Sequence, residues 1–104
     1  MQDTKPALLV VTRDSENDIG FRGLELQLDG KFLANLDNGK DVQVEVEPGQ
    51  HVLRATNSLF SRSLEFTASP GESVNFQVAN VMTGVGKVTM ALGAAIYRVR
   101  LTRM

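Results

Sequence analysis

Apolar and polar residues alternate through much of this chain, and short turn sequences interrupt the alternation at regular intervals. The clearest stretch, residues 24–57, reads LELQLDGKFLANLDNGKDVQVEVEPGQHVLRATN. It contains the pairs Asp29-Gly30, Asn38-Gly39 and Pro48-Gly49. Because successive side chains of a strand point to opposite sides, this pattern predicts consecutive antiparallel strands joined by tight turns. The Asp-Gly pair suits a type I′ turn, whose two central residues both need positive φ.

The same alternation outlines further strands on both sides of this stretch. We expect strands at Ala7–Thr12, Leu24–Leu28, Lys31–Leu36, Val42–Val46, His51–Thr56, Ser63–Thr67, Ser73–Val78 and Ile96–Thr102. Val42, Val44 and Val46 should face inward together, as should Leu64 and Phe66. No long segment has helical periodicity. Seven to eight short strands with polar turns predict one all-β domain over residues 1–104, a sandwich or a barrel.

The glycine-rich apolar segment 81–95, VMTGVGKVTMALGAA, departs from this pattern. An irregular crossover, a short helix around residues 88–92 and a further strand pair all remain open. The segment is shorter than the roughly 20 apolar residues that a spanning helix needs, and it contains Lys87. We therefore expect no membrane insertion, and expect the segment to cover the core or to meet a partner chain.

Composition narrows the classes of partner. Hydrophobic residues make up 42% of the 104 residues, charged residues 22%, and the net charge is -1. Six arginines are candidates for a basic patch: Arg13, Arg22, Arg54, Arg62, Arg98 and Arg100. With one Tyr, no Trp and no excess of basic charge, we expect no nucleic-acid binding, and outward charges that protect edge strands instead. No signal peptide is visible near Met1, so the compartment stays open between the cytoplasm and an envelope location with a removed leader.

The residues that could carry catalysis are few. The chain has no Cys, which excludes disulfides and thiolate chemistry, and His51 is its only histidine. His51 follows the Pro48-Gly49 turn and opens a strand, a position that favours a hydrogen bond bracing the turn. We therefore expect neither an enzyme nor a cofactor.

One acidic loop has oxygen ligands on alternate residues. Counted from Asp14, the residues Glu16, Asp18 and Glu25 fall at the third, fifth and twelfth positions of an EF-hand calcium loop. Ile19 stands where that motif needs Gly, Glu25 lies in an expected strand, and no helix flanks the loop. These four acidic residues are weak candidates for a metal site, and a solvated surface loop is the preferred interpretation.

Three turn motifs resemble those of PEGA-type modules of bacterial surface and envelope proteins, and of related lipoprotein-associated domains of unknown function. The family's V-x-V-D-G, V-x-P-G-x-H-x-V and P-G-E/K patterns match Leu26–Gly30, Val46–Val52 and Pro70–Glu72. Asn35–Asn38 stands where the PEGA tetrad would fall, and no Cys is present for lipidation. The resemblance implies an immunoglobulin-like or transthyretin-like antiparallel sandwich with a binding or structural role, and no catalytic residue.

These observations lead to two hypotheses about function. The first is a non-enzymatic interaction or accessory module that binds a protein or envelope component through a sheet face, an edge strand or the C-terminal segment. Pairing of edge strands would also make a homodimer. The alternative is a small ligand-binding module, for calcium or carbohydrate, that uses the loop at residues 14–18.

Overall fold

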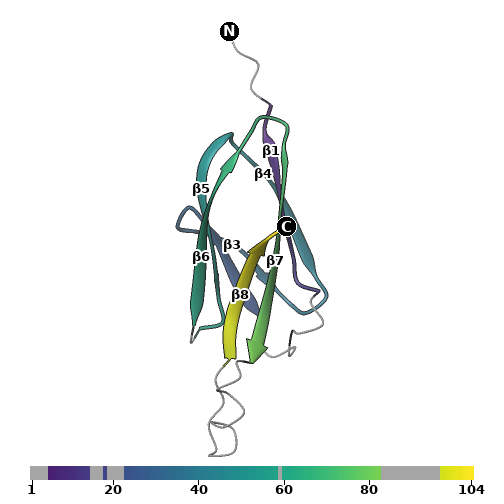
Figure 1. The fold of residues 1–104 in the computed structure, drawn as a ribbon, viewed down its shortest axis with the longest axis vertical. Coiled ribbons are helices and arrows are strands. Elements are labelled where there is room, and N and C mark those ends of the chain that lie inside the picture. Colours follow the sequence, from purple (N-terminus) through teal and green to yellow (C-terminus); the bar gives the residue numbers. More distant parts are fainter. Residues whose placement is uncertain (1–4, 15–17, 19–22, 59, 83–96) are drawn as a thin grey trace, which may run out of the picture.

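The computed structural model describes residues 5–14, 18, 23–58, 60–82 and 97–104. These residues form strands and connecting turns without a helix. The strands are β1 (Ala7–Thr12), β2 (Leu24–Leu28), β3 (Lys31–Leu36), β4 (Asp41–Val46), β5 (Gly49–Thr56), β6 (Ser61–Ala68), β7 (Ser73–Met82) and β8 (Tyr97–Arg103). The predicted all-β sandwich is therefore confirmed (Figure 1).

Two four-stranded sheets make up the sandwich. The β1 sheet has the order β4-β1-β7-β8, and the β2 sheet has the order β3-β2-β5-β6. Neighbouring strands are antiparallel with one exception in the described residues, because β1 runs parallel to β7 from Leu8↔Ser73 to Thr12↔Gln77. Alternation alone predicted antiparallel strands and did not reveal this pair. A parallel pair needs a long crossover, and here the crossover contains the whole β2 sheet.

The core lies between the sheets and takes alternate side chains from most of the strands. Val42, Val44 and Val46 of β4 stand opposite Val11, Leu9 and Ala7 of β1, as the alternation predicted. From the β2 sheet, the most deeply buried apolar side chains are Leu24, Leu26, Leu53 and Ala55. The period of two in the sequence thus marks the buried side of each of these strands.

Aromatic rings join the two sheets near the middle of the core. Phe66 of β6 and Phe76 of β7 meet edge to face, with ring centroids 5.2 Å apart. The predicted inward orientation of Leu64 and Phe66 is confirmed, because Phe66 is buried and Leu64 packs against the core. Edge-to-face contacts of this kind contribute about 0.5–1.5 kcal/mol beyond the buried area.

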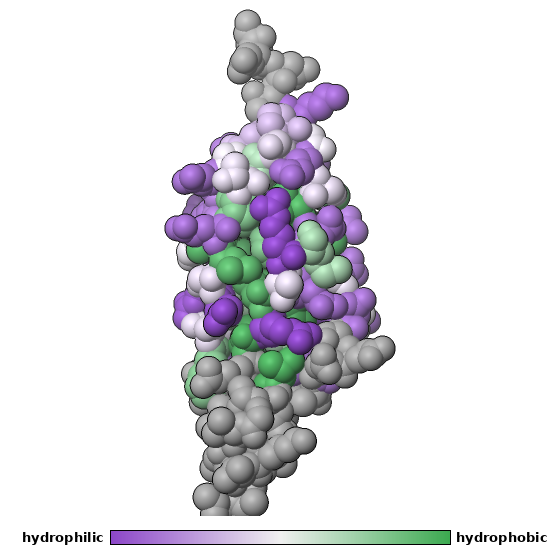
Figure 2. Space-filling view, in the orientation of Figure 1, coloured by the Kyte–Doolittle hydropathy of each residue, from purple (hydrophilic) through white to green (hydrophobic). Residues whose placement is uncertain are grey.

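On one side of the sandwich the edges of the two sheets approach each other, where β6 lies beside β8. Figure 2 shows this side of the molecule, on which hydrophobic residues run along the middle between flanking hydrophilic side chains. Val99 and Leu101 of β8 are buried, in keeping with the common face predicted for these two residues.

The β2–β3 hairpin has the turn that its sequence predicted. Asp29 and Gly30 both have positive φ, 52° and 82°, as a type I′ turn requires. The two-residue turn places Phe32 opposite Gln27, on the outer side of the sheet. The pairing then skips Leu33, a β-bulge that lets Leu33 and Leu36 both reach the core. Alternation alone did not predict this bulge.

A pair of buried amides connects the sheets at the end where β5 turns into β6. Asn57 Nδ2 donates to Asn80 Oδ1 at 3.0 Å, and Asn57 Oδ1 accepts from the Phe60 amide at 2.7 Å. Both asparagines are buried. Buried amides without partners would be costly, so this contact favours one alignment of the two sheets.

Several strand boundaries differ by one or more residues from the sequence-based expectation, and the end of β7 differs most. β7 continues through Val81 and Met82, which the sequence pattern places in the glycine-rich segment. The reason is the β7–β8 pairing, in which Val81 and Met82 stand opposite Arg98 and Tyr97. The remainder of the glycine-rich segment, residues 83–95, lies outside the described residues, so its three interpretations stay open.

Replacing Gly30 by Ala should lower the free energy of unfolding by about 1 kcal/mol, because a Cβ at φ 82° is strained. The matched control is Gly23→Ala, since the φ of Gly23 is not positive and its new Cβ would meet Asp37 Oδ1 at an ordinary 3.5 Å. Urea unfolding of the two variants measures the difference. Equal stability of the two variants would contradict the assigned turn.

Candidate functional site

Asp18, one of the four weak candidates for a metal ligand, forms a buried ion pair with Arg13. Nε of Arg13 lies 2.7 Å from Oδ2 of Asp18, Nη2 lies 3.2 Å from Oδ1, and both side chains are fully buried. Nη1 donates to the Leu36 carbonyl at 2.7 Å. The guanidinium therefore ties Asp18 to the end of β3, and a two-point contact of this kind is strong and geometrically specific.

The backbone of Arg13 takes part in the same junction. Its amide donates to the Lys40 carbonyl at 2.9 Å, and its carbonyl accepts from the Gly39 amide at 2.6 Å. Arg13 therefore does not belong to a basic surface patch. The burial of Arg13 could have been predicted from the alternation, because Arg13 continues the series of inward-facing residues Leu9 and Val11.

The other acidic candidates lie apart from this pair. Asp14 Oδ1 accepts from Gln77 Nε2 at 3.0 Å, and Glu25 Oε2 accepts from Gln27 Nε2 at 2.8 Å. Glu16 lies outside the described residues. Among the residues that are described, no three acidic or histidine side chains gather as a metal site would require. Asp14, Asp18 and Glu25 each contact a different side chain of the protein: Gln77, Arg13 and Gln27 respectively.

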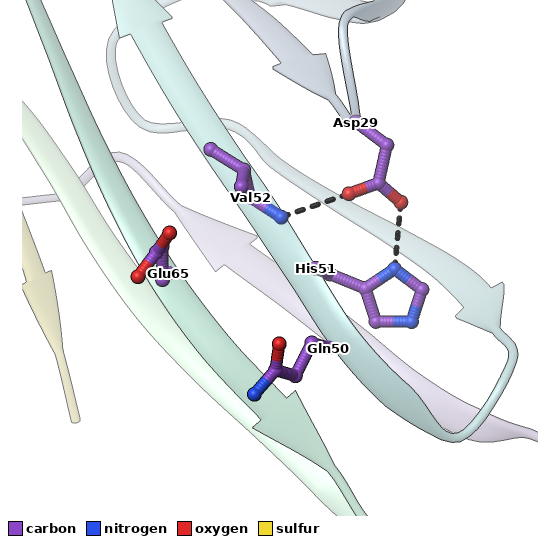
Figure 3. A pocket seen from close by; sticks show the side chains of 5 residues that line it. All are labelled: Asp29, Gln50, His51, Val52 and Glu65. Carbon is purple, nitrogen blue, oxygen red and sulfur yellow. Dashed lines mark hydrogen bonds and ion pairs between the residues drawn. The ribbon is translucent and has the colours of Figure 1, made fainter.

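A second polar cluster, which sequence reasoning found only in part, surrounds His51 at the start of β5 (Figure 3). Nδ1 of His51 lies 2.6 Å from Oδ2 of Asp29, and Nε2 lies 2.5 Å from the Glu47 carbonyl oxygen. The other oxygen of Asp29 accepts from the Val52 amide at 2.8 Å. The prediction that His51 braces its turn is confirmed. The sequence did not reveal the part played by Asp29, although its Asp-Gly turn is a clear local signal.

The local fold brings these groups together for simple reasons. β2 ends at Leu28, which stands opposite Leu53 of β5. The first residues of β5, from Gly49 to Val52, therefore extend beyond the end of β2. Asp29 therefore stands beside Val52, and its amide donates to the Val52 carbonyl at 2.9 Å. On the other side, His51 stands opposite Phe66 of β6, with ring centroids 5.4 Å apart. The ring is thus held by packing as well as by hydrogen bonds.

Both titratable groups of the pair have shifted pKa values. The hydrogen bond to Asp29, followed by that to the Glu47 carbonyl, raises the pKa of His51 above its ordinary value, although burial opposes the shift. Burial acts to raise the pKa of Asp29, but the contacts with His51 and Val52, helped by nearby Lys31, outweigh it and lower that pKa. Each group therefore favours the charged form of the other.

A shallow hollow of about 230 Å³ adjoins the pair. It is lined by Asp29, Gln50, His51, Val52 and Glu65, with Gln50 and Glu65 on neighbouring strands (Figure 3). A second hollow, of about 320 Å³, shares Gln50 and Glu65 and adds Phe66, Thr67 and Arg103. Most of the lining residues are polar and both hollows are open to solvent, so neither encloses a small apolar ligand.

The arrangement offers little for catalysis. A general base needs a ring nitrogen directed at a substrate proton, and both nitrogens of His51 are directed at acceptors within the protein. Asp29 uses both oxygens as well. The pair is thus arranged to hold two turns together.

No family model matches the chain, and no curated protein matches it. The similarity to PEGA-type modules therefore rests on the three turn motifs of the sequence. Over the described residues, no helix has the length and apolar character needed to cross a membrane.

Replacing Asp18 by Asn should destabilise the protein by about 3 kcal/mol, because it removes the carboxylate that lies 2.7 Å from the buried Arg13 guanidinium. Asp14→Asn is the matched control, since Asp14 is an exposed neighbour in the same loop. Chemical unfolding of both variants is the measurement. A decrease below about 0.5 kcal/mol for Asp18→Asn, the range of surface substitutions, would contradict the structural role of the pair.

Proposed function

We propose that this chain is a non-catalytic interaction module that binds another protein through the outer face of the β2 sheet. The observation that carries the proposal is the position of Phe32, which is 64% exposed between the β2–β3 turn and the bulge at Leu33. The two-residue turn and the bulge at Leu33 direct Phe32 outward while its neighbours Leu33 and Leu36 reach the core. The backbone thus presents this ring on the surface.

The surroundings of Phe32 have the composition of a small interface. Phe32 pairs with Gln27, which pairs with Arg54 of β5, so the three side chains form a row across the outer face. Val52, two residues before Arg54, is 38% exposed on the same face. We call Phe32, Arg54 and Val52 the Phe32 patch. Aromatic residues and arginine are enriched at protein interfaces.

Polar side chains frame the Phe32 patch. Glu25, Asn35, Ser63 and Glu65 are outward-facing residues of the same sheet. An apolar centre with a polar rim is the usual anatomy of a protein interface. Burial of the Phe32 ring against a partner would contribute about 1.5–3 kcal/mol, a useful part of a transient interaction.

The proposal also agrees with the chemistry of the rest of the molecule. His51, the only histidine, has both nitrogens engaged, and the chain has no Cys. The turn motifs that resemble those of PEGA-type modules support the same class of function. The alternative of ligand binding at residues 14–18 has no such support, because Asp18 is paired with Arg13.

Capture of a partner should depend on Phe32. The immobilised chain, its Phe32→Ser variant and its Phe60→Ser variant are each exposed to lysate of the source cells, and bound proteins are quantified by mass spectrometry. Phe60 is the matched control because it is 39% exposed in the β5–β6 turn, away from the Phe32 patch. We expect one protein retained by wild type and by Phe60→Ser, and at least tenfold less of it on Phe32→Ser, a factor equal to about 1.4 kcal/mol.

Thermal melting of the three proteins checks that all of them are folded. Equal capture by all three, or no specific capture by wild type, would contradict binding through the Phe32 patch.

A further inference from the structure

We propose that His51 is a proton-dependent latch, which joins the β2–β3 turn to the β4–β5 turn only while its imidazole ring carries two protons. The latch is distinct from the proposed binding through Phe32, and it does not depend on that function. It follows from what the two ring nitrogens face.

Each nitrogen of His51 is directed at an oxygen that can only accept. Nδ1 faces the carboxylate of Asp29 at 2.6 Å, and Nε2 faces the carbonyl of Glu47 at 2.5 Å. A neutral imidazole has one N–H and one lone pair, so it can donate to one of these oxygens and must direct its lone pair at the other. Only the doubly protonated ring satisfies both contacts. The geometry therefore selects the charged form.

Deprotonation of the ring breaks the hydrogen bond to Glu47. Asp29 is held in place independently, because its second oxygen accepts from the Val52 amide and its own amide donates to the Val52 carbonyl. The Nδ1 proton bonded to this carboxylate is therefore retained, and the Nε2 lone pair then opposes the Glu47 carbonyl. That carbonyl belongs to the β4–β5 turn, which must move away or rotate.

Charged groups reach the ring from several elements. Asp29 contributes from the β2–β3 turn, and Glu47 contributes from the β4–β5 turn. Lys31, at the start of β3, acts on Asp29. Glu65 of β6 lines the same hollow, while Phe66 of β6 supplies an uncharged ring against which the imidazole packs. Apart from Lys31, the charged groups named here are acidic, and all of those favour the protonated ring.

The sign of the pH dependence follows from the two shifts. The pKa of His51 is raised, so its contribution to stability is fully present below its ordinary pKa and is lost as the pH rises through the raised value. The pKa of Asp29 is lowered, so its contribution is present above its ordinary pKa and is lost as the pH falls through the lowered value. The latch is therefore closed at least from the ordinary pKa of an aspartate, 3.8, to the ordinary pKa of a histidine, 6.5.

Opening of the latch changes the surface beside it. His51 forms part of the wall of the 230 Å³ hollow, together with Asp29, Gln50, Val52 and Glu65. A shift of the β4–β5 turn moves Gly49 and Gln50, which begin β5. The loss of one proton from His51 therefore changes both the shape and the charge of this hollow.

The test is a pH titration of His51 by NMR. Because the chain has a single histidine, its imidazole Cε1–Hε1 signal is unique. We expect a midpoint above the ordinary value of about 6.5, and amide signals of Gly49 and Gln50 that shift with the same midpoint. A midpoint at or below the ordinary value would overturn the proposal, and so would turn amides that do not follow the ring.

Two variants separate the latch from a general effect of charge. Asp29→Asn keeps the side-chain shape and tolerates positive φ, but it removes the negative charge. It should return the midpoint toward the ordinary value. Asp41→Asn, at the far end of β4 from Glu47, removes an exposed carboxylate and should leave the midpoint unchanged. Equal midpoints in wild type and Asp29→Asn would overturn the proposal.

A third variant provides a measurement that does not rely on the imidazole signal. His51→Gln should abolish the decrease in unfolding midpoint that wild type shows from about pH 6 to about pH 9. Persistence of the same decrease in this variant would show that another group causes it, and would refute the latch.

Discussion

The space between the two sheets is the constraint on which the structure depends. Each strand must direct every second side chain into it, so a slip of one residue in any pairing would expose a whole apolar series. Leu9 and Val44 in one sheet and Leu26 and Leu53 in the other are all placed by this rule. Polar residues that fall into the inward phase must then find partners there, as Arg13 does with Asp18 and Asn80 does with Asn57.

Most of the fold was predictable because local chemistry determines it. The period of two marked the inward valines of β4, and Asp29-Gly30 marked a type I′ turn, since both signals act over a few neighbouring residues. The parallel pairing of β1 with β7 was not predictable, because it joins distant parts of the chain and leaves no local pattern. The bulge at Leu33 was not predictable for another reason. Phe32 and Leu33 are adjacent apolar residues, and a simple alternation is satisfied whichever of the two faces inward.

The candidate sites show the same division. The role of His51 in bracing a turn was predictable, because its position after Pro48-Gly49 is a local signal. Its partner Asp29 lies in another hairpin, and only the finished sheet brings the two together. The acidic residues of the first loop show the converse case, because their regular spacing offered a common metal ligand as the weaker of two interpretations. Burial of Arg13 instead assigns Asp18 a counter-charge within the protein. The spacing of residues in the sequence suggests candidate ligands, but the folded structure determines which side chains come into contact.

The parallel pair of β1 and β7 has a consequence for the order in which the molecule assembles. The β2 sheet consists of the β2–β3 and β5–β6 hairpins joined through β2 and β5, so all of its strands lie between Leu24 and Ala68 and can pair before β7 is made. β1 emerges from the ribosome before the other strands, yet it needs β7, far along the chain, to complete its ladder. Until then one long edge of β1 has no partner, and exposed edges of this kind invite aggregation. During N-to-C synthesis the apolar strand Ala7–Thr12 is therefore the strand whose edge stays unpaired for the longest time. We expect a chaperone to bind this segment first.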